Sequence, residues 1–284
     1  MKNWAILSLA GLGLGITGLG LAFRSWAANW KRETDRFVEK ILKSASTTPE
    51  TTASFKTLEN LPEPVRRYFR FVLKEGQPMI HTARIRQEGE FYLNGKWTPF
   101  TATQSFSTNP PGFVWDACMR MNPLMNVRVR DGYLNEQGLM QAKIIGLVTV
   151  MNAKSDEKLA TAALQRYLAE SAWLPTALLP SENLKWTAID DKSALATLTD
   201  GGTTVSLEFR FNETGQIVEI FTPARFKEVY GEYKPFPWAG RFTNYEERSA
   251  MMIPLEGEVE WQTPEGNEPY WKGRIAEVFY DFVY

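Results

Sequence analysis

Charged side chains alternate along three strand-like segments, and carboxylates in such rows are the groups best suited to acid–base chemistry. The rows are Arg84, Arg86, Glu88 and Glu90; Glu256, Glu258 and Glu260; and Arg128 and Arg130. Buried carboxylates would have raised pKa values and could transfer protons. Alternating charge is, however, typical of the solvated side of an antiparallel sheet, where cross-strand ion pairs contribute little. We therefore predict solvated faces, and Glu170, Asp190 and Glu258 are the carboxylates that acid–base chemistry would need.

Nucleophiles and metal ligands are scarce in this sequence. It has one histidine, His81, and one cysteine, Cys118. A single cysteine excludes an internal disulfide and a multi-cysteine metal site, and classical zinc sites need several such ligands. Cys118 stands among apolar residues, which predicts an inert core thiol. GxSxG, HExxH and P-loop motifs are absent. We predict no catalytic residues, no metal and no cofactor.

The net charge and the aromatic content indicate which kinds of partner the protein could bind. Lys and Arg number 32 against 33 Asp and Glu, so no net field attracts nucleic acid. The aromatic fraction is 13%, more than a thin one-sided sheet needs. Such residues could line an apolar cavity or fill a solid core, and both alternatives stay open. The predicted ligand-binding residues are Tyr167, Trp173, Trp186, Phe209, Phe211 and Trp238.

The first segment of the chain is apolar. Trp4–Phe23 is an uncharged run of 20 residues, long enough for a helix to cross a bilayer. We predict an uncleaved, single-pass membrane anchor at residues 1–25; a cleaved signal peptide is the alternative. Gly11 and Gly15 have GxxxG spacing, which could let two anchors pack as a homodimer.

The side of the membrane is left open by the sequence. Arg24, Lys31, Arg32 and Arg36 follow the apolar run, and only Lys2 precedes it. The positive-inside rule therefore favours a cytoplasmic domain, although an N-terminal anchor followed by a long domain is often exported.

The rest of the chain divides into a stalk and one domain. Residues 26–60 read as a charged helix followed by a Ser/Thr-rich hinge, and residues 61–284 as an antiparallel β domain. A helical insert at 155–180 interrupts the strands, with apolar residues at helical spacing. Because strand-like sequence lies on both sides, we expect this insert to cover the concave face of a curved sheet.

Strand patterns fill the remainder of the domain. Asn94-Gly95 between two alternating runs predicts a tight hairpin. The predicted strands are Ile80–Leu93, Trp97–Ser107, Phe113–Met119, Val127–Tyr133, Ala142–Met151, Leu184–Ile189, Ala194–Thr199, Val205–Phe211, Ile217–Thr222, Phe236–Glu246, Met252–Trp261 and Tyr270–Tyr284. No βαβ alternation occurs, so we predict an α+β fold with a curved, half-barrel-like antiparallel sheet.

Several segments carry a resemblance to known proteins. They are LPEPVRRYFRFVL, GFVWDACMRM, ALQRYLAESAWLPTALLP, TVSLEFRFNETGQI, PWAGRFTNYEER, IPLEGEVEW and PYWKGRI. Together they resemble a bacterial family of single-anchor membrane proteins with one β-rich domain and no assigned activity. The order of helix, strands, helical insert and strands is also similar to the half-barrel of lipoprotein-localisation carriers. That resemblance implies acyl-chain binding between sheet and helix, and a periplasmic or extracytoplasmic domain.

These observations lead to one functional prediction with two alternatives. We predict a membrane-tethered, non-catalytic domain that binds an apolar or amphipathic ligand, a lipid or a lipidated protein, near the bilayer. The first alternative is a protein–protein scaffold with a solid core. The second is an enzyme that uses strand carboxylates. A continuous apolar cavity between insert and sheet would separate the first prediction from the scaffold.

Overall fold

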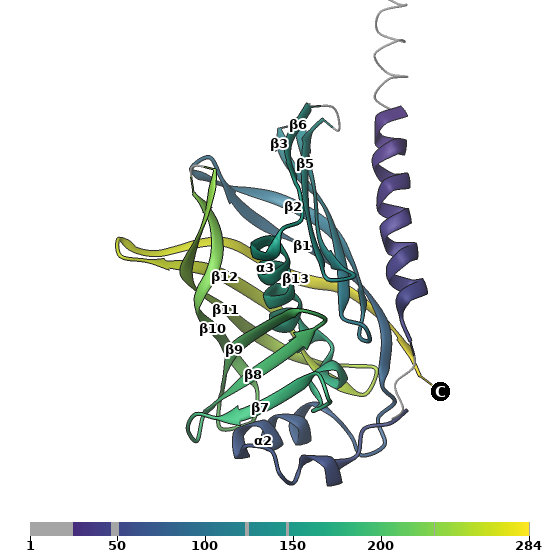
Figure 1. Ribbon diagram of the computed structural model, residues 1–284, viewed down its shortest axis with the longest axis vertical. Coiled ribbons are helices and arrows are strands. Elements are labelled where there is room, and N and C mark those ends of the chain that lie inside the picture. The colour runs from purple at the N-terminus through teal and green to yellow at the C-terminus, as the bar shows by residue number, and fades with distance from the viewer. Residues whose placement is uncertain (1–24, 47–50, 123–124, 146–147, 230, 284) are drawn as a thin grey trace, which may run out of the picture.

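A single curved antiparallel sheet organises the chain (Figure 1). The computed structural model describes residues 25–46, 51–122, 125–145, 148–229 and 231–283. The strands are β1 Ile80–Leu93, β2 Lys96–Ser107, β3 Gly112–Asn122, β4 Met125–Leu134, β5 Gln137–Ile144, β6 Val148–Ala153, β7 Leu184–Ala188, β8 Ser193–Asp200, β9 Thr203–Phe211, β10 Ile217–Val229, β11 Glu232–Arg248, β12 Met251–Thr263 and β13 Gly266–Phe282. The predicted α+β class and curved antiparallel sheet are confirmed.

The first and last strands pair in the middle of this sheet. β1 pairs with β13 from Ile80 opposite Phe282 to Phe91 opposite Trp271. The strand order is therefore β6-β5-β4-β3-β2-β1-β13-β12-β11-β10-β9-β8-β7. The edge strands β6 and β7 are the two that flank the helical insert in sequence. The insert thus crosses from one edge of the sheet to the other.

One predicted strand is wrong. The continuous apolar pattern of Ala142–Met151 predicts a single strand, but β5 ends at Ile144 and β6 begins at Val148. Ile145 has a φ of 53°, a left-handed conformation that ends the strand. A β-branched residue is unfavourable there, so Ile145 does not itself mark the turn, and Gly146 after it is the one local signal.

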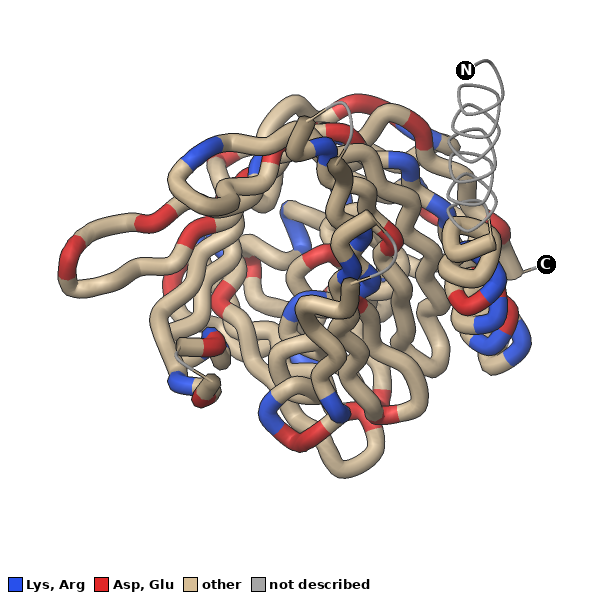
Figure 2. The backbone as a smooth tube through the Cα atoms, turned by 90° about the horizontal axis from the view of Figure 1, so that it is seen from above, with Lys and Arg blue, Asp and Glu red and all other residues tan. Residues whose placement is uncertain are grey.

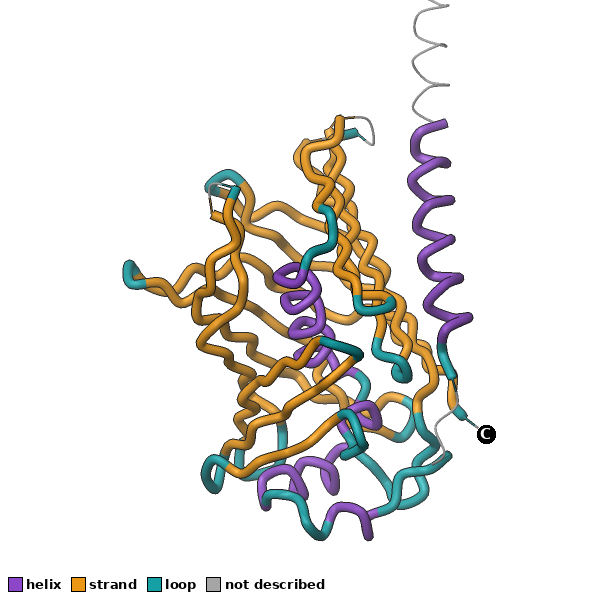
Figure 3. Tube along the Cα trace, in the orientation of Figure 1, coloured by secondary structure: helices purple, strands orange, loops and turns teal. Residues whose placement is uncertain are grey.

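The helical insert lies on the concave side of the sheet (Figure 3). It contains α3 Glu157–Glu170 and the 3₁₀ turns η2 Ser171–Trp173 and η3 Pro175–Leu178. The Asp156 carboxylate caps α3 by accepting a hydrogen bond of 2.8 Å from the backbone N–H of Leu159. α3 packs on β4 and β5 on one side and on β9 and β10 on the other. It therefore ties the two halves of the curved sheet together.

The lower end of the half-barrel is closed by α2 Glu63–Val72 (Figure 1). η1 Phe55–Leu58 precedes this helix. Tyr68 and Phe69 of α2 are fully buried, and the Tyr68 ring lies 5.8 Å from that of Phe211. The insert is fixed at the same end, because the Thr176 hydroxyl accepts a hydrogen bond from Ile80 N–H at 2.9 Å. The core therefore fills this end of the sheet.

A helix of residues 25–44 lies along the outer face of the sheet, and Figure 2 shows it beside the curved strands. Trp30 is 1% exposed, and its Nε1 donates a hydrogen bond of 2.8 Å to Asp116 on β3. None of the helices that the structure describes combines the length and apolar character needed to cross a bilayer. The predicted anchor at residues 4–23, with Gly11 and Gly15, lies outside the described residues.

Candidate functional site

A belt of aromatic side chains runs across the concave face of the sheet beside α3. Its members are Trp115 on β3, Phe100 on β2, Phe91 on β1, Tyr270 and Trp271 on β13, Trp261 on β12 and Trp238 on β11. We call this set the aromatic belt. It brings together six neighbouring strands of the sheet, with the β1–β13 pair at the centre.

Ring contacts make the aromatic belt nearly continuous. The Phe100 ring centroid lies 5.7 Å from Trp115 and 5.9 Å from Trp271. Tyr270 lies 5.7 Å from Phe91 and stacks on Trp261 at 5.8 Å. These distances are in the favourable range for aromatic pairs. A bulge between Val259 and Glu260 in the β12–β13 pairing lets the neighbouring Tyr270 and Trp271 both face inward.

The belt is not sealed from solvent. Phe91, Trp261, Tyr270 and Trp271 are only partly buried, although they pack against the hydrophobic core. The hairpins that carry them extend beyond α3 in Figure 1, so α3 does not cover their tips. Large aromatic rings on a concave face that stay partly exposed are typical of a surface that receives an apolar ligand.

Two arginines lie at the ends of the belt, and both contact α3. The Arg166 guanidinium of α3 lies 5.0 Å from the Trp115 ring centroid. Arg225 of β10 lies 5.1 Å from the Trp238 ring and donates a hydrogen bond of 2.8 Å to the carbonyl of Ala162. Cation–π contacts of this kind orient the guanidinium planes over the rings.

Arg166 is neutralised by two carboxylates. It forms ion pairs with Asp131 on β4 and, at 2.8 Å, with Glu170 on α3. The three side chains are 12–16% exposed. Gln104 donates a hydrogen bond of 2.6 Å to Glu170, and Gln87 donates one of 3.2 Å to Gln104. This chain of polar groups links α3 to β1, β2 and β4.

The pKa shifts at this cluster follow from burial and charge. Burial raises the pKa of the Glu170 carboxyl, against the opposing effect of the Arg166 charge. The Arg166 pKa is raised because Glu170 and Asp131 outweigh the effect of burial. Burial lowers the pKa of Arg225. Among the described residues Arg225 forms no ion pair of its own, although the charges of Asp131 and Glu170 act on it from a distance and favour its charged form.

The six residues predicted to bind a ligand fall into separate places. Trp238 belongs to the aromatic belt. Trp186, Phe209 and Phe211 form one cluster at the closed end, where the Trp186 ring lies 5.1 Å from Phe209. Tyr167 packs on Phe106 and Trp173 on Phe242. All of these except the partly buried Trp186 are at most 5% exposed.

The three carboxylates predicted for acid–base chemistry also separate. Only Glu170 lies in the concave face. Asp190 lies in an exposed turn, where the backbone N–H of Lys192 lowers its pKa. Glu258 lies on the outer face, 3.8 Å from Arg241 and 55% exposed. No group of three or more His, Cys, Asp or Glu able to hold a metal occurs within the described ranges.

Of the three charge rows, that of Arg84, Arg86, Glu88 and Glu90 lies on a solvated face as predicted, whereas each of the other two contains a buried residue. In the second row Glu260 is 7% exposed, so the prediction is wrong there. Cross-strand ion pairs join Arg86 to Glu277, Glu88 to Arg274 and Glu90 to Lys272. Arg130, in contrast, is 0% exposed because the helix of residues 25–44 covers it. The prediction of a solvated face is wrong at this residue.

Cys118 and His81 carry no site of their own. Cys118 is only partly buried, and its pairing with Arg128 places it on the outer face, so the prediction of a core thiol is wrong. His81 begins β1, and its Nδ1 is buried without a hydrogen-bond partner among the described atoms.

Of the aromatic belt, only Trp238 is among the six residues predicted to bind a ligand. Trp261 and Trp271 lie in alternating patterns in the sequence, but nothing local shows that β13 pairs with β1 and thereby places Trp271 near Phe100. The long-range pairing of the first and last strands is the missing information.

The fold and the belt define an α+β half-barrel domain with an aromatic concave face. The chain belongs to the Family of unknown function (DUF6920), whose sequence profile matches residues 59–280. This confirms the resemblance to a bacterial family with no assigned activity. No curated protein matches the chain.

Three solved structures are similar to the chain at low sequence identity. A domain provisionally described as an outer membrane lipoprotein-sorting protein, from Vibrio parahaemolyticus, has a TM-score of 0.36 and 8% identity, covering 71% of this chain and 86% of its own. A DUF1329 family protein from Desulfovibrio piger has a TM-score of 0.39 and 9% identity, with the same coverages of 71% and 86%. A LolA superfamily protein from Nitrosomonas europaea has a TM-score of 0.32 and 12% identity, covering 76% and 90%. The resemblance to lipoprotein-localisation carriers stated above is to this class of structure.

Proposed function

We propose that the domain binds an amphipathic molecule, a lipid or the lipid group of a protein, on its concave face. The apolar chain lies on the aromatic belt, and a negatively charged head lies near Arg225. The observation that supports this most strongly is the partial exposure of Phe91, Trp261, Tyr270 and Trp271 on the concave side. An acyl chain would bury these rings at a gain of about 25 cal/mol for each Å² of apolar surface.

The electrostatics beside the belt support an amphipathic ligand rather than a purely apolar one. Arg166 is already paired with Asp131 and Glu170, whereas Arg225 has no carboxylate partner in the described part of the chain. A guanidinium that makes no ion pair of its own can receive a carboxylate or phosphate head in a charge-assisted hydrogen bond.

The position of the domain in the cell is part of the same proposal. An anchor at residues 4–23 would hold the domain close to a bilayer, where lipids and lipidated proteins are available. The single pass, the side on which the domain lies and a homodimer through Gly11 and Gly15 stay predictions.

The two alternatives rest on weaker observations. A scaffold would need only the solid core at the closed end, and the belt would then be a docking surface. An enzyme would use Glu170, because a carboxyl group with a raised pKa can transfer protons closer to neutral pH. However, Glu170 and Asp131 both pair with the same guanidinium, an arrangement that fixes α3 and leaves neither carboxylate free.

Native mass spectrometry of the full chain extracted in mild detergent tests the proposal. We expect adducts whose masses correspond to phospholipids or fatty acids and which persist after detergent is removed. Chains that carry no lipid, and that bind none when a fatty acid is added, would contradict the proposal and favour the scaffold.

A further inference from the structure

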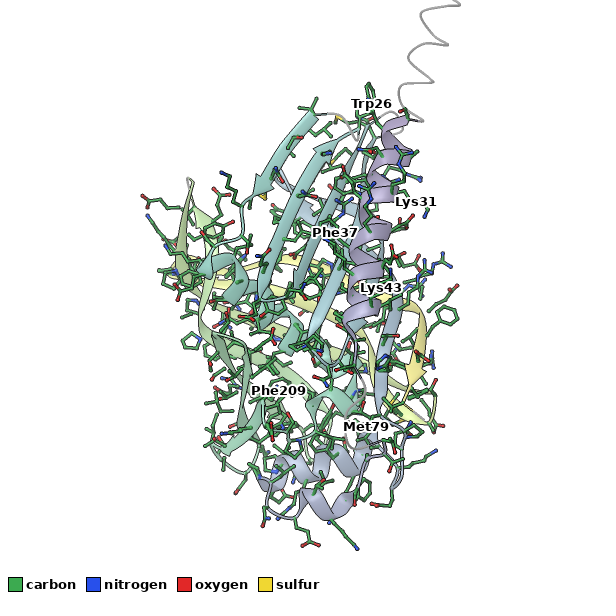
Figure 4. The ribbon with its side chains drawn as sticks, turned by 45° about the vertical axis from the view of Figure 1, so that its right-hand side comes forward. Trp26, Lys31, Phe37, Lys43, Met79 and Phe209 are labelled. Carbon is green, nitrogen blue, oxygen red and sulfur yellow. The ribbon has the colours of Figure 1, made fainter. Side chains whose placement is uncertain are left out.

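A second surface with ligand-binding character lies on the outer face of the sheet. A groove of about 620 Å³ separates the helix of residues 25–44 from strands β4, β5 and β6. In Figure 4, Phe37, which lines this groove, and Lys31, which does not, lie on opposite sides of the helix. The groove is thus distinct from the concave face.

Positive charge dominates the lining of this groove. Its charged residues are Arg36, Lys40, Lys43, Arg130 and Lys143 against Glu33 and Glu39. Lys43 pairs with Glu39 at 2.6 Å, and Arg130 pairs with Glu33 at 3.4 Å. The three cations that remain, Arg36, Lys40 and Lys143, form no ion pair within the described part of the chain.

The groove on the opposite side of the helix provides a comparison. It has a volume of about 780 Å³, and its charged residues are Lys31, Arg84 and Arg128 against Asp35, Asp116 and Asp281. These charges balance. The same helix therefore faces one neutral groove and one with three uncompensated cations, so the excess of positive charge belongs to one side only.

The wall of the cationic groove is rigid. Arg130 is fully buried, with its guanidinium 4.1 Å from the Trp30 ring and hydrogen-bonded to the carbonyl of Trp30 at 2.8 Å. Lys143 lies 5.5 Å from the same ring. Gln141 accepts a hydrogen bond of 2.7 Å from Arg130. Helix and sheet are held together there, so the exposed cations Arg36 and Lys40 face a surface fixed by these contacts.

Apolar side chains also line this groove. Phe37 of the helix and Met151 of the edge strand β6 are both partly exposed in it. Partly exposed apolar residues beside unpaired Lys and Arg are typical of surfaces that bind an anionic membrane: the cations attract the head groups and the apolar groups contact the acyl region.

We propose that this groove binds the phosphate head group of an anionic phospholipid, with Phe37 and Met151 contacting the apolar part of the lipid. The site does not rest on the function proposed for the concave face, since it shares no residue with the aromatic belt. It would hold the outer face of the domain against the bilayer surface.

Isothermal titration of the full chain in a nonionic detergent tests this site. The probes are dihexanoylphosphatidylglycerol, its phosphatidylcholine counterpart and sodium phosphate. We expect phosphatidylglycerol to bind more tightly than the other two, with an affinity that falls as salt is added. Equal affinity for the two lipids, or binding of sodium phosphate as tight as that of phosphatidylglycerol, would overturn the proposal.

Charge-reversal variants place the binding in the groove. The double variant Lys40→Glu, Lys143→Glu should lose about tenfold or more in affinity for phosphatidylglycerol. The matched control, Lys56→Glu, Lys185→Glu, makes the same charge change at two exposed lysines outside the groove and should keep the affinity within about twofold. Circular dichroism checks that both variants fold. An equal loss in the two variants would show that net charge, and not the groove, binds the lipid, and would overturn the proposal.

Discussion

Arg166 and Arg225 lie over opposite ends of the aromatic belt, at 5.0 Å from the Trp115 ring and 5.1 Å from the Trp238 ring. Both hold α3, Arg166 as part of it and Arg225 through the Ala162 carbonyl. Only Arg166 has carboxylate partners in the described structure. The two ends of the belt therefore differ, and under the proposed function a ligand with a negative head would have one preferred orientation.

Replacement of Arg225 should separate head-group recognition from chain binding. We expect Arg225→Met to lower the affinity for a long-chain fatty acid by about tenfold, a typical loss for one charge-assisted hydrogen bond. The affinity for the corresponding alcohol should change little, because it has no charge to pair. Fluorescence titration of the full chain with both ligands measures this. Equal losses for acid and alcohol would argue against a role in head-group recognition.

The Arg166 cluster should be a major contributor to stability. Asp131→Ala removes one of the two carboxylates that pair with Arg166, and we expect it to lower the free energy of unfolding by about 2–3 kcal/mol, the typical loss for a partly buried hydrogen bond to a charged group. Glu258→Ala removes an exposed pair with Arg241 on the outer face and should cost less than about 1 kcal/mol. Urea unfolding of both variants gives the two values. A small effect of Asp131→Ala would mean that α3 is held by its apolar contacts alone.

The raised pKa of Glu170 gives stability a specific dependence on pH. The folded protein holds the Glu170 proton more tightly than the unfolded chain, whose pKa is about 4.5. Stability contributed by the protonated form is therefore lost as the pH rises from that value through the raised pKa. In Glu170→Gln, which faces the same Arg166, Gln104 and Asp131, this loss should be absent.

Urea midpoints of wild type and Glu170→Gln, measured between about pH 4 and pH 8, test that difference. Asp200 also has a pKa raised by burial, but it is present in both proteins and cancels. If the difference in urea midpoint between wild type and Glu170→Gln did not change with pH, the raised pKa of Glu170 would be contradicted.

Gly138 allows α3 to approach β5 closely. A Cβ at this position would lie 2.7 Å from both Cγ and the carbonyl oxygen of Leu159. We expect Gly138→Ala to lower the free energy of unfolding by about 1–3 kcal/mol, because the helix must shift. Gly202→Ala, where no atom lies within 4 Å, should be close to neutral. Thermal unfolding compares them, and equal midpoints would show that α3 shifts without cost.

The sequence predicted those parts of the fold that local patterns encode. Asn94-Gly95 marked the β1–β2 hairpin, and alternation marked most strands. The β5–β6 turn was missed because Ile145 takes a left-handed conformation that its residue type disfavours. Contacts between distant segments were also missed. Arg130 alternates like a solvated residue, and only the docking of Trp30 shows that it is buried.

The sequence predicted the apolar, aromatic character of the candidate site but not the position of most of its residues. Excess aromatic residues indicated a concave apolar surface, and Trp238 was named. Of the other five predicted residues, Trp186, Phe209 and Phe211 pack on strands at the closed end, and Tyr167 and Trp173 belong to the insert itself and point into the core. The belt depends on the β1–β13 pairing and on the bulge near Glu260, which periodicity does not reveal.

The central proposal, lipid on the aromatic belt, is tested most directly by photo-crosslinking. The full chain is expressed in membranes that contain a phospholipid with a diazirine in its acyl chain, irradiated and digested, and the adducts are located by mass spectrometry. Trp97 provides the control, because it lies on the opposite face, under Lys272, and is also partly buried. We predict adducts on peptides that carry Trp261, Tyr270 and Trp271, reduced in Trp271→Glu and retained in Trp97→Glu. Adducts confined to residues outside the concave face, or unchanged in Trp271→Glu, would contradict the proposal.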